Sequence, residues 1–328
     1  MDALLEKINK LYGLSVHSPE KVTKGLLTEN HVLTEGDKKY FLKRYRFDSK
    51  KEIEEIHLVK KYFASGGIPV ILPILNKELN TFFAFENKYF ALFPFVEGRQ
   101  LELDSLTDTA IISLGEMLGK IHLLGKEAKL SITDDFGAWD KEKVLAKFEN
   151  ITAMIYQQKE LSDFDKLALE DLKRRKFLVE SNSINFEDLG LKNDHLIQGD
   201  YHTGNLFFDD YDHVSSVFDF EKARYAPRVF ELVRSLAHIF FQNDFSPGNI
   251  TKAKLYLNSY LKIYPISRGE IEKGFKIYYL KMLHSSWVQS EHYLKNNYRV
   301  DHLLAGNFER IKYLSEHLEE LINKLMIL

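Results

Sequence analysis

Cysteine is absent from this chain of 328 residues. The protein therefore forms no disulfide, uses no thiolate nucleophile and builds no zinc site with cysteine ligands. This absence fits a reducing compartment, and we expect the protein to act in the cytoplasm. The sequence also lacks a run of about 18 apolar residues, and charges are spread through its first residues. It therefore predicts neither a transmembrane helix nor a signal peptide, and we expect no membrane partner.

Charge of one sign is not concentrated in any segment. The chain has 45 Lys and Arg residues against 48 Asp and Glu residues, a net charge of −3. Without a basic block, a dedicated nucleic-acid-binding function is excluded. Internal repeats and low-complexity linkers are missing as well, and 45% of the residues are hydrophobic, as in ordinary soluble globular proteins. The length suggests two folding units, or one large one.

The first 97 residues predict a β-rich lobe with few helices. Apolar residues at helical spacing predict an N-terminal helix that Gly13 ends. A second helix is expected over 48–64, with Asp48 or Ser49 as its cap. Short strands are expected around these helices, over 20–47 and in the segments VILPIL, TFFAFE and KYFALFPFV.

After Glu97-Gly98 the pattern becomes mostly helical. Helices are expected over 105–125, over 140–180 as two or three units, and from about 228 to the end. Residues 195–220 instead read as short strands separated by turns. The sequence thus predicts two domains, 1–97 and 98–328, with no flexible spacer between them.

The residues that carry chemistry lie between positions 198 and 221. Asp200 and Asn205 are five residues apart in a loop between two short strands, and Asp219 ends the next strand. A strand, a hairpin turn and a return strand would bring Asp219 back beside Asn205. Carboxylate and carboxamide oxygens are ligands that suit Mg²⁺ alongside waters and phosphates. The remaining carboxylate can take a proton from an attacking hydroxyl.

This pattern resembles the phosphoryl-transfer core of the protein-kinase-like fold, and more closely that of the aminoglycoside phosphotransferase and choline kinase family. In that family the loop commonly reads His-Gly-Asp-x-His-x-Gly-Asn, and the later strand Ile-Asp-Phe/Trp-Glu. The matching residues here are Asp200, His202, Gly204, Asn205, Asp219 and Glu221. Three features depart from the family: Gln198 replaces a histidine, Glu231 replaces an aspartate, and the nucleotide-covering loop over 24–30 has one glycine.

The resemblance implies an α+β, two-lobed protein-kinase-like fold, with a small β-rich N-lobe and a larger, mostly helical C-lobe. It also implies a catalytic role for Asp200, which would orient and deprotonate the acceptor hydroxyl. Asn205 and Asp219 would bind Mg²⁺. We expect Gln198 and Glu231 to have structural roles. We expect His202 to brace the loop by hydrogen bonds.

The same resemblance assigns the nucleotide site to the N-lobe. Lys43 would hold the α- and β-phosphates of ATP, with GTP as the alternative nucleotide. Glu55, on the following helix, would orient Lys43 in the nucleotide-bound state, and Glu54 is the alternative partner. The hinge segment, residues 89–99, contains Phe93 and Phe95 and would meet the adenine through its backbone.

The function that these residues indicate is an ATP-dependent small-molecule kinase acting on a hydroxyl of a sugar, amino alcohol, nucleoside or antibiotic. A protein Ser/Thr kinase is the alternative. Only the seven residues 220–226 separate Asp219 from Pro227, and none is Ser or Thr, which speaks against a long activation segment. Compact bacterial stress-response members keep this alternative open. Gln198 and the single-glycine loop leave a third, a catalytically silent nucleotide-binding protein. The sequence identifies neither the acceptor nor the oligomeric state.

Overall fold

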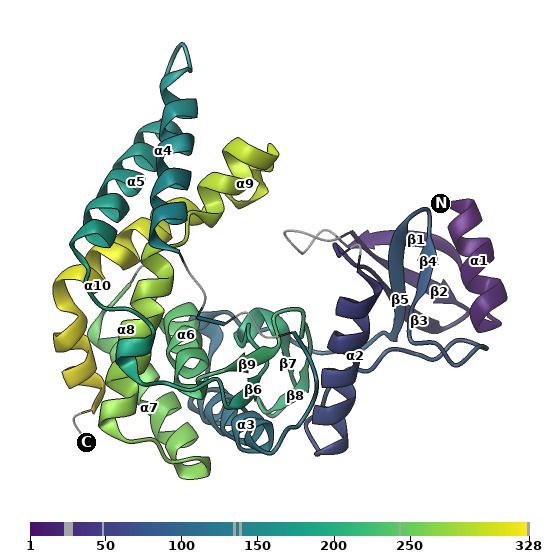
Figure 1. Ribbon diagram of the computed structural model, residues 1–328. Helices are drawn as coiled ribbons and strands as arrows, with labels where there is room; N and C mark the ends of the chain where they lie inside the picture. Colours follow the sequence, from purple (N-terminus) through teal and green to yellow (C-terminus); the bar gives the residue numbers. More distant parts are fainter. Residues whose placement is uncertain (23–28, 48, 134–135, 138–139, 243, 327–328) are drawn as a thin grey trace.

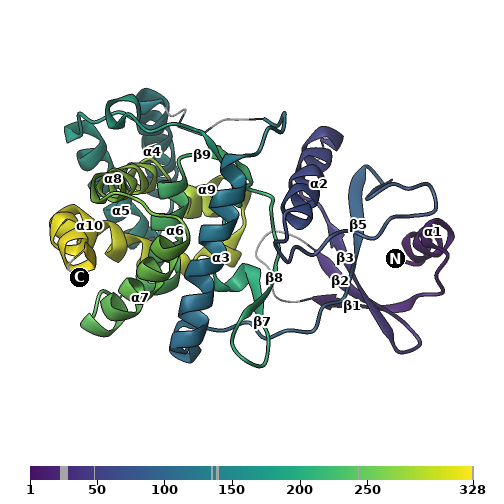
Figure 2. The same ribbon diagram turned by 90° about the horizontal axis from the view of Figure 1, so that it is seen from below.

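The computed structural model describes residues 1–22, 29–47, 49–133, 136–137, 140–242 and 244–326. Two lobes lie next to each other, a smaller one built around a sheet and a larger one built mainly of helices (Figures 1 and 2). The α+β architecture is the one that the sequence predicted. Within the described residues, no helix has both the length and the apolar character needed to cross a bilayer.

The N-lobe is an antiparallel sheet of five strands in the order β1-β2-β3-β5-β4. Its strands are β1 (His17–Val22), β2 (Asn30–Glu35), β3 (Lys38–Arg44), β4 (Phe83–Phe85) and β5 (Lys88–Pro94). Side chains alternate between the two faces, so Leu92 packs with helix α1 (Asp2–Tyr12) while Phe93 packs with helix α2 (Lys50–Ser65). Ser49 caps α2 by accepting a hydrogen bond from Glu52 N at 3.3 Å.

The predicted strand over 70–75 is wrong. Within that segment, Val70 alone forms a β-bridge, and its partner is Val217 of the C-lobe. Pro73 lacks the N–H group that a ladder requires, which disfavours a strand inside a sheet. The segment instead joins the lobes, because Ile71 N donates to Val217 O at 3.3 Å and Val217 N donates to Pro69 O at 2.8 Å.

The C-lobe combines helices with two small antiparallel sheets, β6–β9 and β7–β8. Its helices are α3 (Asp108–Lys126), α4 (Lys141–Tyr156), α5 (Asp163–Ser181), α6 (Arg228–Phe240), α7 (Pro247–Ile263), α8 (Arg268–Leu283), α9 (Trp287–Lys295) and α10 (Leu303–Met326). Its strands are β6 (His195–Ile197), β7 (Leu206–Phe208), β8 (Val214–Val217) and β9 (Arg224–Ala226). Four single-turn 3₁₀ helices are η1 (Leu103–Ser105), η2 (Glu187–Leu189), η3 (Thr203–Asn205) and η4 (Tyr298–Val300). The sequence predicted this order of helices and strands, apart from β9.

Helix α2 also packs against the C-lobe. Ile56, Val59 and Phe63 belong to the same buried core as α3, and Tyr62 donates to Leu124 O at 2.9 Å. Helix α2 precedes residue 97 in the chain, yet it shares this core with the larger lobe. The predicted domain boundary between residues 97 and 98 therefore stays a prediction.

Candidate active site

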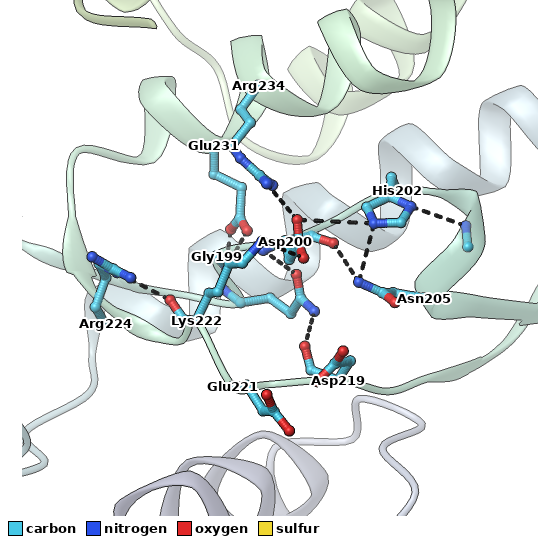
Figure 3. A network of polar contacts seen from close by, with 12 residues as sticks. Gly199, Asp200, His202, Asn205, Asp219, Glu221, Lys222, Arg224, Glu231 and Arg234 are labelled. Atoms are coloured by element: carbon cyan, nitrogen blue, oxygen red, sulfur yellow. Dashed lines mark hydrogen bonds and ion pairs between the residues drawn. The ribbon is translucent and has the colours of Figure 1, made fainter. Parts of the chain in front are cut away.

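The loop that carries the predicted catalytic residue, 198–205, is called the catalytic loop below and joins β6 to β7; β8 returns antiparallel to β7 (Figure 1). Leu206 is paired with Val217 in this hairpin, and Phe218 N donates to Asn205 O at 3.1 Å. The hairpin therefore places Asp219 beside Asn205, as the spacing predicted. Figure 3 shows Asp200 between two groups of side chains, with Arg234 and His202 on one side and Asp219 and Glu221 on the other.

Gln198 ties the catalytic loop to the strand that carries Asp219. Its Nε2 donates to Phe218 O at 3.1 Å and to Asp219 O at 2.6 Å, while its Oε1 accepts from Asp200 N at 2.7 Å. Asp219 has φ 56, a left-handed conformation that costs energy for a residue other than glycine. The Gln198 side chain holds that strained backbone in place, which confirms the expected structural role.

Glu231, on α6, anchors the same loop (Figure 3). Its buried carboxylate accepts hydrogen bonds from Gln198 N at 3.1 Å and from Gly199 N, and it accepts another from His122 Nε2 at 2.9 Å. Burial lowers the pKa of His122, so the neutral ring donates to Glu231 and accepts from Tyr260 Oη at 2.9 Å through Nδ1. The expected structural role of Glu231 is confirmed.

Gly199 is required by the close approach of two backbones. Its φ is +87, and a Cβ atom there would lie 2.0 Å from Lys222 O. Any side chain would push the loop away from the segment that follows Asp219. The spacing between Asp200 and Asp219 therefore depends on this glycine.

Both oxygens of Asp200 are paired with cations. Arg234 Nη2 lies 2.5 Å from Oδ1, and Lys222 Nζ lies 2.8 Å from Oδ2. Burial would raise the pKa of this carboxyl group, but Arg234 and Lys222 hold the pKa far below its usual range. Asp200 is therefore ionised at neutral pH and can accept a hydrogen bond from a hydroxyl group.

His202 braces the loop, as predicted. Its Nδ1 accepts from Gly204 N at 3.1 Å, and its Nε2 lies 3.8 Å from Asp200 Oδ1. Asn205 Nδ2 donates to Asp200 O at 2.9 Å. The side-chain oxygen of Asn205, Oδ1, is consequently the atom of this side chain that can bind a cation.

Lys43 reaches from the N-lobe to the residues after β8. Its Nζ lies 3.1 Å from Asp219 Oδ1 and 2.8 Å from Glu221 Oε1, and Arg46 Nε lies 3.3 Å from Glu221 Oε2. Burial would lower the pKa of Lys43, but Asp219 and Glu221 raise it above its ordinary value. Burial would likewise raise the pKa of Asp219, yet Lys43 keeps it low. The charged forms of Lys43 and Asp219 are thus favoured.

Glu55 does not lie with Lys43. Its carboxylate accepts from Thr133 N at 3.1 Å and from Thr133 Oγ1 at 3.3 Å, and it lies 3.5 Å from Lys51 Nζ. The buried residues on the sheet-facing side of α2 are Ile53, His57 and Lys60. The Lys43–Glu55 pair stays a prediction for the nucleotide-bound state.

The two hinge phenylalanines differ in environment. Phe93 is buried between β5 and α2, with Lys60 Nζ 4.4 Å from its ring centroid. Phe95 is partly buried, and Lys39 Nζ lies 5.5 Å from its ring centroid. Their predicted part in binding adenine stays a prediction. Residues 24–28, most of the nucleotide-covering loop over 24–30, lie outside the described residues.

Two site residues were missed from the sequence, Lys222 and Arg234. Lys222 follows the Asp219-Phe220-Glu221 motif directly, and Arg234 lies three residues after Glu231 on α6. The helical spacing of Glu231 and Arg234 was the available signal, because residues three apart share a helix face.

In the described part of the chain, no group of three or more His, Asp or Glu side chains is arranged to hold a metal ion. Asn205 and Asp219 offer one amide oxygen and one carboxylate. This donor set fits Mg²⁺, which keeps few protein ligands and takes others from water and substrate phosphates.

Comparison with known proteins gives the class of this chain. The model of the phosphotransferase enzyme family (APH) matches residues 20–264, more than half of the sequence. The chain therefore belongs to that phosphotransferase family.

Among individual proteins, the chain is similar to serine/threonine protein kinase RdoA of Salmonella typhimurium, with 29% identity over 142 residues. This match spans 42% of the chain and 40% of the relative. The structure of a microcompartment-associated aminopropanol kinase has TM-score 0.65 and 15% identity, covering 99% of this chain and 100% of that one. Amicoumacin kinase hAmiN, solved with AMP-PNP and Ca²⁺, has TM-score 0.60 and 15% identity, covering 92% and 93%. These likenesses confirm the two-lobed kinase-like fold.

Proposed function

We propose that this protein is an ATP-dependent kinase that transfers the γ-phosphoryl group to a hydroxyl of a small molecule. The observation that carries the proposal is the meeting of Asp200, Asn205 and Asp219 in one site, with Lys43 brought to Asp219 from the other lobe at 3.1 Å. Each part has a place in phosphoryl transfer, where positioning and electrostatics supply most of the rate. Membership of the phosphotransferase family supports the same reaction.

In this mechanism, Asp200 accepts a hydrogen bond from the acceptor hydroxyl and aims its oxygen at the γ-phosphorus. The new bond forms between these atoms, the bond to the β–γ bridging oxygen breaks, and ADP leaves. The low pKa of Asp200 makes it a weak base. It therefore serves first to orient the hydroxyl and takes the proton late, as a loose transition state allows.

Asn205 and Asp219 would hold Mg²⁺, which supplies positive charge beside the β- and γ-phosphate oxygens. Lys43 would leave its present contacts in part to hold the α- and β-phosphates, while Glu221 keeps the ammonium in position. ATP is the nucleotide that we propose, with GTP as the alternative. We propose the cytoplasm as the compartment, because an ATP-consuming enzyme needs a supply of ATP.

A protein substrate is the second candidate, and the relative named as a serine/threonine protein kinase favours it. The structure offers little room for an activation segment. Residues 220–223 lead directly to β9 (Arg224–Ala226), which pairs with β6, and α6 begins at Arg228. This compactness supports the small-molecule acceptor.

The experiment is ADP formation with a panel of small hydroxyl compounds, for the wild type and for Asp200→Asn. We expect the substitution to lower turnover by about 10²- to 10⁴-fold, the usual contribution of a positioned acid or base. Asp210→Asn is the matched control, because Asp210 is exposed at the turn between β7 and β8. Near-normal turnover by the Asp200 variant would remove Asp200 from the mechanism.

A further inference from the structure

Two cationic side chains surround the carboxylate of Asp200. Arg234 occupies one of its oxygens at 2.5 Å and Lys222 the other at 2.8 Å. The Arg234 side chain is 14% exposed and that of Lys222 is 41% exposed. The negative charge of Asp200 is therefore faced by two positive charges. Arg234 is mostly buried in the wall of the site, and Lys222 lies at its surface.

The other carboxylates of the site do not offset this excess. Asp219 and Glu221 lie on the opposite side of Asp200 and pair with Lys43 (Figure 3). The Glu231 carboxylate already accepts from two backbone N–H groups and from His122. Lys43 and Arg46 balance Asp219 and Glu221, so the spare positive charge of the site lies beside Asp200, on the acceptor side.

His202 and His238 complete the acceptor side, with ring centroids 6.1 Å apart. Burial lowers the pKa of His202, and the charge of Asp200 only partly offsets this. Burial and the charge of Arg234 hold the pKa of His238 well below its ordinary value. Both rings are neutral at neutral pH, so they add hydrogen-bonding groups to this side without adding charge.

Arg234 has a donor to spare. Its Nη1 is buried and makes no hydrogen bond to any residue that the structure describes. A buried donor without a partner is costly, and an oxyanion beside it would remove that cost. The ammonium group of Lys222 has further N–H groups that can point to the same anion, because the side chain is partly in solvent.

We propose that the acceptor of this kinase carries a carboxylate or phosphate group next to the hydroxyl that is phosphorylated. Arg234 and Lys222 bind this anionic group, and the hydroxyl then lies at Asp200. This inference rests on the proposed function, and it leaves the bonds made and broken in the transfer unchanged. A cationic amine would meet two like charges here, those of Arg234 and Lys222.

The test is calorimetric titration of the full-length protein, with and without saturating Mg²⁺ and AMP-PNP. The probes share a three-carbon skeleton: glycerate carries a carboxylate, glycerol 3-phosphate a phosphate, 3-amino-1,2-propanediol an amine, and glycerol no charge. We expect one or both anions to bind in the presence of AMP-PNP and to bind more tightly than the amine or glycerol. The two anionic arms distinguish a carboxylate acceptor from a phosphate acceptor.

Three variants locate the anion. Arg234→Gln and Lys222→Gln should each weaken anion binding by about 10- to 100-fold, the scale of one charge-assisted hydrogen bond, and should leave AMP-PNP binding nearly unchanged. Lys276→Gln is the control, since Lys276 is exposed on α8 and should bind anions as the wild type does. Because Lys222 is partly exposed, its variant keeps the test valid if Arg234→Gln fails to fold.

Several outcomes would overturn the inference: tighter binding of the amine, no binding of either anion, or anion binding that both variants leave intact. Anion binding that AMP-PNP abolishes would also overturn it, because the two cations would then serve the γ-phosphate. Failure of the proposed function looks different. In that case AMP-PNP would not bind even with Mg²⁺. If the wild type then bound the anion without nucleotide and Arg234→Gln did not, the anion site would still be supported.

Discussion

Lys43 is held by two carboxylates that follow β8, Asp219 and Glu221. The side chain of Glu221 is 9% exposed and also pairs with Arg46, so its carboxylate has little freedom to move when a nucleotide binds. A flexible ammonium needs such a fixed partner to be aimed at phosphates. Glu221 is thus the residue that we expect to keep Lys43 in place when Asp219 turns to the metal.

We therefore expect Glu221→Gln to raise the KM for ATP by about tenfold, because one charge-assisted hydrogen bond to Lys43 is weakened. Steady-state kinetics of this variant should be compared with those of Glu55→Gln. Glu52→Gln, at an exposed position of α2, is the control and should match the wild type. A large effect in Glu55→Gln with none in Glu221→Gln would favour the pair that the sequence predicted.

Lys60 occupies the buried face of α2, near Lys43. It donates to Ile71 O at 3.3 Å and lies against the Phe93 ring. Burial lowers the pKa of Lys60 from 10.5 to about 7, and the charge of Lys43 contributes to the shift. Below that pKa the folded protein holds a buried positive charge, which destabilises it.

Lys60→Met should raise the melting temperature, and more so at low pH. Between the folded pKa, about 7, and the ordinary value of 10.5, the unfolded chain binds more protons than the folded one. The wild type therefore gains stability across this window as the pH rises. The difference between variant and wild type should be largest at about pH 6 and small near pH 10, measured by thermal unfolding. Lys61→Met is the control, because Lys61 is exposed and the melting temperature of this variant, relative to the wild type, should show no such dependence on pH. If the difference in melting temperature between Lys60→Met and the wild type did not change with pH, the lowered pKa of Lys60 would be contradicted.

At the scale of elements, α3 packs closely against both α7 and β6. Glycines let other backbones approach it closely: a Cβ at Gly115 would lie 2.4 Å from Tyr256 O of α7, and one at Gly125 would lie 2.1 Å from Leu196 O of β6. Strand β6 leads directly into the catalytic loop. The position of that loop consequently depends on a glycine in a helix of another part of the sequence.

We predict that Gly125→Ala lowers the free energy of unfolding by about 1–3 kcal/mol, the usual effect of overpacking. Alanine is a better helix former than glycine by about 1 kcal/mol. A loss of stability in this variant would therefore show that the clash with Leu196 O outweighs the gain in helix propensity. Gly269→Ala on α8 is the matched control, since a Cβ there meets nothing within 4 Å. Denaturant unfolding measures both, and a more stable Gly125 variant would contradict the prediction.

In the whole molecule, α2 couples the two lobes. Phe63 is fully buried, and its ring centroid lies 5.6 Å from that of Phe220, the residue after Asp219. Together with the bridge from Val70 to Val217, this contact makes one continuous core from the N-lobe helix to the active-site hairpin. We therefore expect the lobes to unfold together.

Phe63→Ala should lower stability by about 3–5 kcal/mol, as expected for a large buried side chain. Calorimetry of the wild type should show one transition whose calorimetric and van't Hoff enthalpies agree. Phe177→Ala is the control, because Phe177 is 68% exposed and should leave the melting temperature nearly unchanged. Two separate transitions in the wild type would show that the lobes are independent.

The sequence alone determined the order of the elements and the core of the site. Asp200, Asn205 and Asp219 lie within twenty residues of chain, and a hairpin of fixed register needs only local pairing to bring them together. The pattern failed at residues 70–75, where apolar residues around Pro73 suggested a strand and tertiary contacts made a link between lobes.

Only the tertiary structure decided which charges face each other. Lys43 and Asp219 are 176 residues apart, and their contact depends on how the two lobes are joined. The contact of Glu55 with Thr133, and that of Arg234 with Asp200, depend on how far α2 and α6 are rotated about their axes. One residue position is a rotation of about 100°, and packing against distant segments sets that angle.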